Sequence, residues 1–131
     1  MLYIADTGNK RVIKYDISSG RVAGILESGE LTGPRGVFVT ENGDIYVADT
    51  GAKAVLIFDK DFNLLNKLTR PDAPIFADTN YEPKRVAVDG GGNVYLNGEG
   101  VYNGVIQQAK TGENLAYLAV NDPDLTFTQR L

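Results

Sequence analysis

The sequence repeats itself with a period of 43 residues. The segment LYIADTGNKRVIKYD at positions 2–16 returns as IYVADTGAKAVLIFD at positions 45–59. Each copy holds two apolar or alternating runs on either side of a polar turn, which is typical of paired β-strands. A period in the low forties, built from short strands and Gly-rich turns, is typical of β-propeller blades or a similar β array. The repeat therefore predicts an all-β fold made of consecutive small sheets.

A looser repeat extends the array toward the C-terminus. The segment GPRGVFVTENGDIYV at 33–47 returns as YEPKRVAVDGGGNVYL at 81–96, with Pro34 and Pro83 offset by 49 residues. The six extra positions fall in the stretch 69–82. Each full repeat is expected to form four antiparallel strands. In the second repeat these strands are expected at residues 36–40, 45–48, 54–59 and 64–68.

The stretch GPRGVFVTENGDIYVADTGAKAVLIFD at 33–59 resembles an NHL repeat. The family pattern is Pro-x-Gly-Val-Ala-Val, a Gly turn, a strand ending in Tyr-Val-Ala-Asp, a short polar loop and a β-rich run ending in Asp. The resemblance covers nearly all of residues 2–120, although the third copy has Asn97-Gly98 in place of Ala-Asp and inserts residues 101–103. It implies β-propeller blades of four-stranded antiparallel sheets. The expected single propeller segment has a partial first blade at 2–32, blades at 33–80 and 81–120, and a further blade or closing strand beginning at 121–131.

The first repeat has no counterpart of residues 36–40, so we expect the first blade to lack its inner strand. Three blades at most form an incomplete ring, since propellers usually have about four to eight. Three interpretations stay open: a segment of a longer protein, a homodimer of two half-rings, or a missing strand supplied by residues 121–131. The alternation at 125–128 suits a strand. The first two interpretations are favoured.

Composition restricts the chemistry. The 131 residues contain no Cys and no His, which removes disulfides, thiol nucleophiles, imidazole bases and the usual zinc ligands. The net charge of −4, with both signs interspersed, argues against a nucleic-acid partner.

Apolar runs such as 54–58 are far shorter than the roughly 20 residues of a membrane-spanning helix. We expect no cofactor, no metal and no membrane span; the compartment stays open, although bacterial proteins resembling this one are often exported or attached to the envelope.

Two motifs resemble catalytic or metal sites without meeting their requirements. Asp-Thr-Gly occurs at 6–8 and at 49–51, but aspartic proteases need their two carboxylates about 3 Å apart, and here a blade separates them. We interpret both as structural loops capped by Asp and Thr. Residues 59–63 begin like a calcium loop, but Leu64 and Arg70 stand where Gly and Glu are needed, so a hairpin turn is expected.

Surface recognition is the function that these patterns favour. Because antiparallel strands alternate in direction, the loops from second to third strands and from each blade to the next emerge on one face, here called the loop face. We predict a non-catalytic module that binds a protein or carbohydrate-like ligand on this face, with no catalytic residue in the chain. The alternatives are a metal-dependent lactonase-like or lyase-like propeller enzyme completed by further blades, and a purely structural segment. The candidate binding residues are Arg35, Asp49, Lys53, Phe76, Tyr81, Lys84, Arg85, Glu99 and Tyr102.

Overall fold

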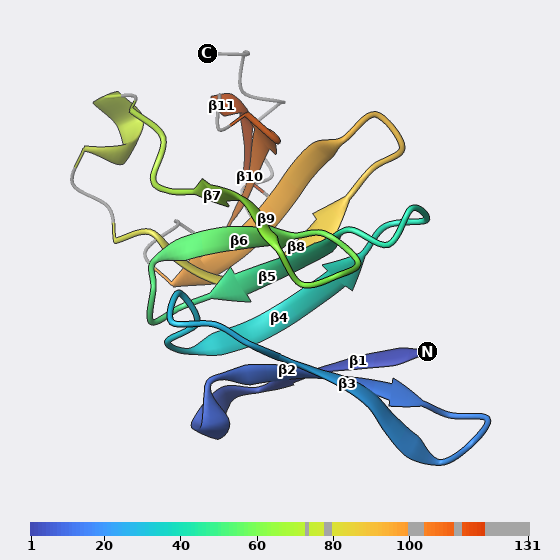
Figure 1. The fold of residues 1–131 in the computed structure, drawn as a ribbon. Helices are drawn as coiled ribbons and strands as arrows, with labels where there is room; N and C mark the ends of the chain where they lie inside the picture. Colours follow the sequence, from blue (N-terminus) through green and yellow to red (C-terminus); the bar gives the residue numbers. More distant parts are fainter. Residues whose placement is uncertain (73, 78–79, 100–103, 112–113, 120–131) are drawn as a thin grey trace.

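The computed structural model describes residues 1–131 except 73, 78–79, 100–103, 112–113 and 120–131. It contains three antiparallel sheets that follow one another along the chain and lie in a row (Figure 1). This arrangement confirms the predicted all-β class and the organisation in small antiparallel sheets. Among the described residues, no helix has the length and apolar character that crossing a bilayer requires.

Each sheet uses strands that are consecutive in sequence. The first sheet holds β1 (Leu2–Asp6), β2 (Arg11–Asp16) and β3 (Arg21–Glu27), with the 3-10 helix η1 (Thr7–Asn9) between the first two. The second sheet holds β4 (Pro34–Val39), β5 (Ile45–Asp49), β6 (Ala54–Phe58) and β7 (Leu64–Leu68). The third holds β8 (Glu82–Val88), β9 (Asn93–Glu99), β10 (Gly104–Ala109) and β11 (Asn114–Ala119), and is preceded by the 3-10 helix η2 (Pro74–Phe76).

The four strands expected in the second repeat all form, within two residues of their predicted ends. The β4–β5 turn is closed by a hydrogen bond from the Thr40 N–H to the Asp44 carbonyl at 3.0 Å. Gly43 adopts φ +91° in this turn, a conformation that side-chain-bearing residues rarely take. In the first sheet, β1 is an edge strand that pairs only with β2 in the described part of the chain. The possible closing strand at 121–131 lies outside the described residues.

Two hydrophobic cores hold the row together, one between each pair of neighbouring sheets. The first joins Val12 and Leu26 of the first sheet to Ile45, Val47, Ala54, Leu56 and Phe58 of the second. The second joins Tyr46, Val55, Ile57 and Leu68 of the second sheet to Val94, Leu96 and Ile106 of the third. The middle sheet is therefore covered on both faces, which explains why every residue of β5 and β6 is buried and why Asp49 is their only charged residue.

Hydrogen bonds from the Asp-Thr-Gly loops also link the sheets. The Thr7 hydroxyl donates to the Pro34 carbonyl at 2.7 Å, and the Thr50 hydroxyl donates to the Pro83 carbonyl at 2.6 Å. Each bond runs from one sheet to the beginning of the inner strand of the next. The two loops therefore have the structural role that the sequence indicated, and they fix the starting points of β4 and β8.

Candidate functional site

Basic residues gather where the two inner strands begin, on the loop face. Both strands carry a register shift at this end, between Pro34 and Gly36 in β4 and between Pro83 and Arg85 in β8. Arg35 and Lys84 occupy these two irregular positions. Bulges of this kind re-aim a side chain and are common beside functional sites.

The close approach of the inner strands brings these residues together. A Cβ atom placed on Gly36 would lie 2.5 Å from the Lys84 carbonyl oxygen and 3.1 Å from the Arg85 Cα. Only glycine permits this spacing, because any side chain at position 36 would collide with the backbone of β8. Arg35 and Arg85 are exposed, and Lys84 is half-buried. We call Arg35, Lys84 and Arg85 the basic cluster.

Among the described residues, no carboxylate forms an ion pair with Arg35 or Arg85. Ion pairs there join Arg11 to Asp6 at 2.8 Å and Lys67 to Glu30 at 3.6 Å, and neither Arg35 nor Arg85 takes part in one. Arg35 and Arg85 instead present guanidinium groups to solvent at one end of the inner strands.

Lys53 lies at the same end of the second sheet. It adopts φ +53°, and its N–H donates to the Thr50 carbonyl at 3.3 Å, which closes the Asp-Thr-Gly loop. The bond from Thr50 to Pro83 places this loop beside the start of β8. Since the Lys53 side chain is exposed, it adds a positive charge to the surface near the basic cluster.

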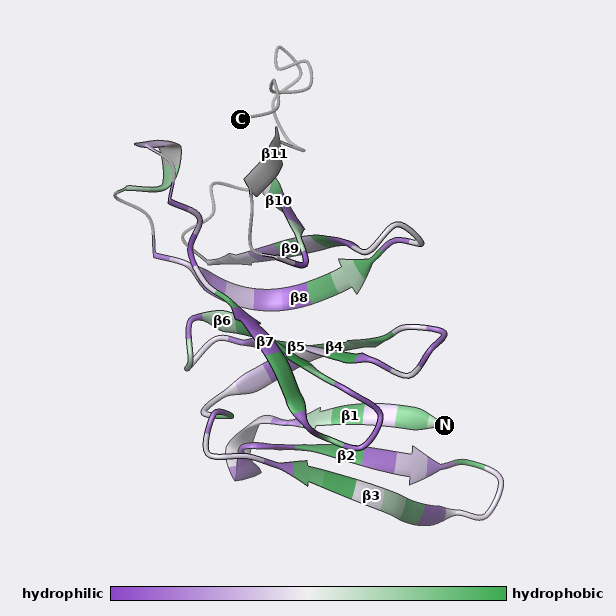
Figure 2. Ribbon diagram, turned by 45° about the horizontal axis from the view of Figure 1, so that its top comes forward, coloured by the Kyte–Doolittle hydropathy of each residue, from purple (hydrophilic) through white to green (hydrophobic). Residues whose placement is uncertain are grey.

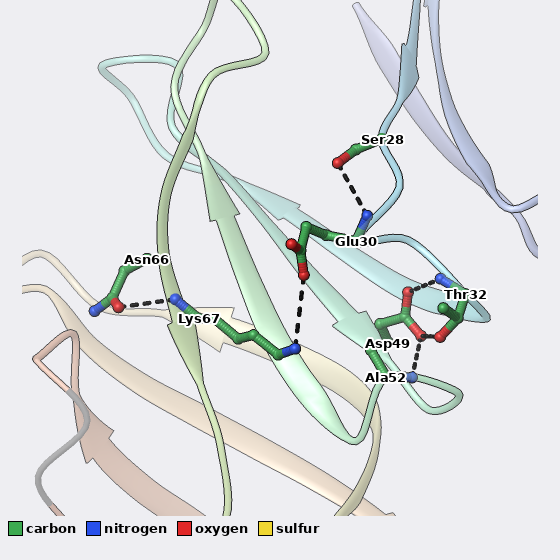
Figure 3. Close-up of polar contacts among 7 residues, drawn as sticks. All are labelled: Ser28, Glu30, Thr32, Asp49, Ala52, Asn66 and Lys67. Carbon is green, nitrogen blue, oxygen red and sulfur yellow. Dashed lines mark hydrogen bonds and ion pairs between the residues drawn. The ribbon is translucent and has the colours of Figure 1, made fainter.

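Asp49 is a structural residue rather than an exposed one. Its side chain is fully buried, and one carboxylate oxygen accepts hydrogen bonds from the N–H groups of Gly33 and Ala52, both at 2.8 Å. Thr32 donates its N–H at 2.8 Å and its hydroxyl at 3.2 Å (Figure 3). The carboxylate ties the connection from the first sheet to the loop after β5. The expectation that Asp49 lies on the binding surface is corrected by this burial.

Phe76 and Tyr81 are also buried, contrary to the expectation that the 69–82 segment presents them to a ligand. Both belong to the core between the second and third sheets. The Tyr81 hydroxyl donates to the Gln108 Oε1 at 2.7 Å, and burial raises the pKa of Tyr81. By register, Gln108 stands where the second sheet has Phe58, so the extra residues of this segment satisfy a polar side chain inside the core.

Two predicted candidates remain, Glu99 and Tyr102. Glu99 is the last residue of β9 and lies opposite Glu82 in the register. Tyr102 lies outside the described residues. The side chain of Glu99 likewise lies outside the part of the chain that the structure describes.

A groove that the sequence did not indicate lies at the opposite ends of the inner strands. Its volume is about 470 Å³, and it runs between the β4–β5 and β8–β9 turns. Its lining combines apolar with charged and polar residues, among them Phe38, Tyr46, Val88, Glu41, Asp89 and Lys110. The turn sequences that border it indicated hairpins only, since no motif marks a concave surface formed between two repeats.

Asp89 lies on the rim of this groove, and its carboxylate forms hydrogen bonds within its own hairpin. Its carboxylate accepts bonds from the Asn93 side chain at 3.0 Å and from the Tyr95 hydroxyl at 2.9 Å. These bonds, led by the one from Asn93, hold the pKa of Asp89 below its ordinary value. No group of three or more His, Cys, Asp or Glu residues within the described chain is arranged to hold a metal ion.

Comparison with known proteins places the array in a structural class. Residues 31–58 match the NHL repeat family. A comparison with curated protein sequences found no match. The fold is similar to that of hydrazine synthase from Kuenenia stuttgartiensis, with a TM-score of 0.70 and 17% identity over 92% of this chain and 32% of that one.

Two further solved structures are similar over the same share of the chain. A catalytically inactive variant of virginiamycin B lyase from Staphylococcus aureus, with quinupristin, gives a TM-score of 0.66 at 12% identity, covering 92% of this chain and 38% of that one. A protein of unknown function from Bacteroides caccae gives 0.59 at 13% identity, covering 92% and 42%. The chain thus spans less than half the length of these structures, and the likeness shows a β-propeller fold alone.

Proposed function

We propose that this array of NHL-like propeller blades is a non-catalytic binding module that recognises a carboxylate-bearing protein or carbohydrate-like ligand through its loop face. The observation that carries the proposal is that Arg35 and Arg85 lie at the same end of two neighbouring inner strands. Both are exposed, both are brought to one place by the contact of β4 with β8, and neither has a carboxylate partner in the described ranges.

The chemistry of the guanidinium group supports an anionic ligand. Arginine presents a planar fork of N–H donors that fits a carboxylate through two parallel hydrogen bonds. Placing two such guanidinium groups near each other raises their mutual repulsion, which a bound carboxylate relieves. The inner strands supply a rigid base, because each is paired on one side and packed against a core.

A catalytic propeller is the second candidate, since the similar structures include a synthase and a lyase. At sequence identities of 12% and 17%, the similarity supports a shared fold but not a shared activity. A metal-dependent turnover that is lost when Glu82 is changed to Gln would favour this candidate. A binding isotherm without turnover favours the module.

Titration calorimetry with two probes tests the proposal: a hexaglutamate peptide and an oligogalacturonate. We expect at least one probe to bind at low salt, and Arg35→Glu or Arg85→Glu to weaken it by about tenfold or more, since each removes a charge-assisted contact. Arg21→Glu is the matched control, because it makes the same charge change on an exposed residue of β3. Equal affinities for all three variants would remove the basic cluster from the site.

A further inference from the structure

One face of the first sheet is apolar, and no other described part of the chain covers it. The register places Leu2 opposite Tyr15, and Ile4 opposite Ile13, which in turn lies opposite Ile25, so these five residues share one face. Leu2, Ile4 and Ile25 are 46%, 40% and 43% exposed. The first sheet lies at one end of the row, and hydrophobic stretches are visible on β1 and β3 (Figure 2). We call this surface the open face.

The 43-residue repeat shows what the same positions do in the next sheet. The counterparts of Leu2, Ile4, Ile13 and Tyr15 are Ile45, Val47, Leu56 and Phe58. All four are buried in the core between the first and second sheets, with at most 1% of their surface exposed. The open face of the first repeat therefore corresponds to a surface that is packed against a neighbouring sheet in the second repeat.

In the second sheet, the corresponding surface is covered by residues on the opposite face of the first sheet. Val12 and Leu26 lie in the core, and Tyr3 packs against it. Lys14 lies beside Tyr3, with its Nζ 6.0 Å from the centre of the ring. The face that covers the second sheet thus includes a tyrosine, a valine, a leucine and one polar side chain.

The third sheet carries a tyrosine, a valine and a polar residue at the corresponding positions of the face that points away from the second sheet. By register, Tyr95, Val105 and Gln107 are the counterparts of Tyr3, Val12 and Lys14. Gln107 contacts the tyrosine as Lys14 does, since its Nε2 donates to the Tyr95 hydroxyl at 3.2 Å. These three side chains are half-buried, whereas the other face of β9 and β10 forms the core toward the second sheet. We call Tyr95, Val105 and Gln107 the far face.

We propose that the open face of one copy packs on the far face of a second copy, so that two copies close one ring. Two copies of three sheets give six sheets, which lies within the usual range for a propeller of about four to eight blades. A twofold arrangement forms this contact twice and leaves neither face uncovered. The interface continues the packing that already joins the three sheets within one chain.

Sedimentation equilibrium of the 131-residue chain at several concentrations tests the proposal. The expected mass is twice the 14.2 kDa of one chain. A single-chain mass at all concentrations overturns the proposal, and so does a series of growing species, since a closed ring admits no further copy. The wild-type result alone decides between these outcomes.

Variants on each face then test the pairing. Ile4→Glu on the open face and Val105→Glu on the far face are each expected to shift the mass to that of one chain, with the far-ultraviolet circular dichroism retained. Leu65→Glu is the matched control, because Leu65 is an apolar residue of β7 that is 55% exposed and belongs to neither face. A dimer that survives Val105→Glu, or that is lost equally in Leu65→Glu, contradicts the assignment of the two faces.

Discussion

The hydroxyl of Thr50 donates a 2.6 Å hydrogen bond to the carbonyl oxygen of Pro83, across the boundary between the second and third sheets. Thr7 makes the counterpart bond to Pro34 at 2.7 Å. Each held proline is followed directly by a residue of the basic cluster, Lys84 or Arg35. The loops that join the sheets therefore also fix the origin of the proposed binding surface.

Replacing Thr50 with Val is expected to lower the free energy of unfolding by about 0.5–1.5 kcal/mol, the usual contribution of one hydrogen bond. The valine keeps the size of the side chain but leaves the Pro83 carbonyl without this donor. Urea unfolding followed by circular dichroism measures the change. Thr50→Ser retains the hydroxyl and is expected to keep most of the stability; an equal loss in both variants would contradict the role of the hydroxyl.

Asp49→Ala is expected to cost more, about 1–3 kcal/mol, because three backbone N–H donors lose their common buried acceptor. Asp6→Ala is the matched control from the same position of the first repeat. The Asp6 side chain is partly exposed and bonds only Arg11 and Asn9 among its described side-chain contacts. Thermal or urea unfolding of the two variants is compared directly, and equal losses would show that the buried network around Asp49 adds no stability.

Gly36→Ala is expected to destabilise the chain by about 1–3 kcal/mol, since the new methyl group would overlap the backbone of β8. The inner strands must separate to admit it, so ligand affinity at the basic cluster is expected to fall in parallel. Gly8→Ala is the control, because no atom lies within 4 Å of a Cβ atom placed there. Unchanged unfolding and unchanged affinity in Gly36→Ala would contradict the close contact of β4 with β8.

Acid is expected to destabilise the protein through its turn carboxylates. Hydrogen bonds lower the pKa of Asp89, chiefly from the Asn93 side chain, and the pKa of Asp59, chiefly from the Asn63 backbone N–H. The folded state thus binds these protons less tightly than the unfolded chain, so the stabilisation is present above about pH 4 and is lost as the pH falls through the lowered pKa values.

Asn93→Ala tests this pH dependence at one site. The variant removes the leading hydrogen bond, so the pKa of Asp89 is expected to rise toward its ordinary value, while the pKa of Asp59 stays low. Carboxyl-carbon NMR titration measures both groups in one experiment. A wild-type pKa of Asp89 at the ordinary value would contradict the role of its hydrogen bonds.

The repeat was sufficient to predict the sheets, because strand alternation and turn chemistry are local. The strand Leu64–Leu68 appears with its predicted bounds, and the residues between the first two predicted strands of that repeat form a closed turn. Burial within the loops was not predictable in the same way. Asp6 and Asp49 have nearly the same neighbours in sequence, yet Asp49 is buried because Thr32 and Gly33 reach it from an earlier connection.

The aromatic residues of the 69–82 segment show the same limit. An extra segment with Phe76 and Tyr81 suits a binding loop and a core filling equally well when only its sequence is known. The outcome depends on Gln108, which is 27 positions beyond Tyr81 and whose buried amide needs the tyrosine hydroxyl. Such pairings arise from the packing of neighbouring sheets, and no local pattern encodes them.

The location of ligand contact tests the account most directly. Backbone amide NMR of the labelled chain, titrated with hexaglutamate at low salt, reports which residues the probe approaches. We predict the largest shifts at Arg35, Gly36 and Arg85, with Asn42 and Gly92 at the opposite groove unchanged. Shifts confined to Asn42 and Gly92, or no shift at the basic cluster at saturating probe, would contradict recognition through the loop face.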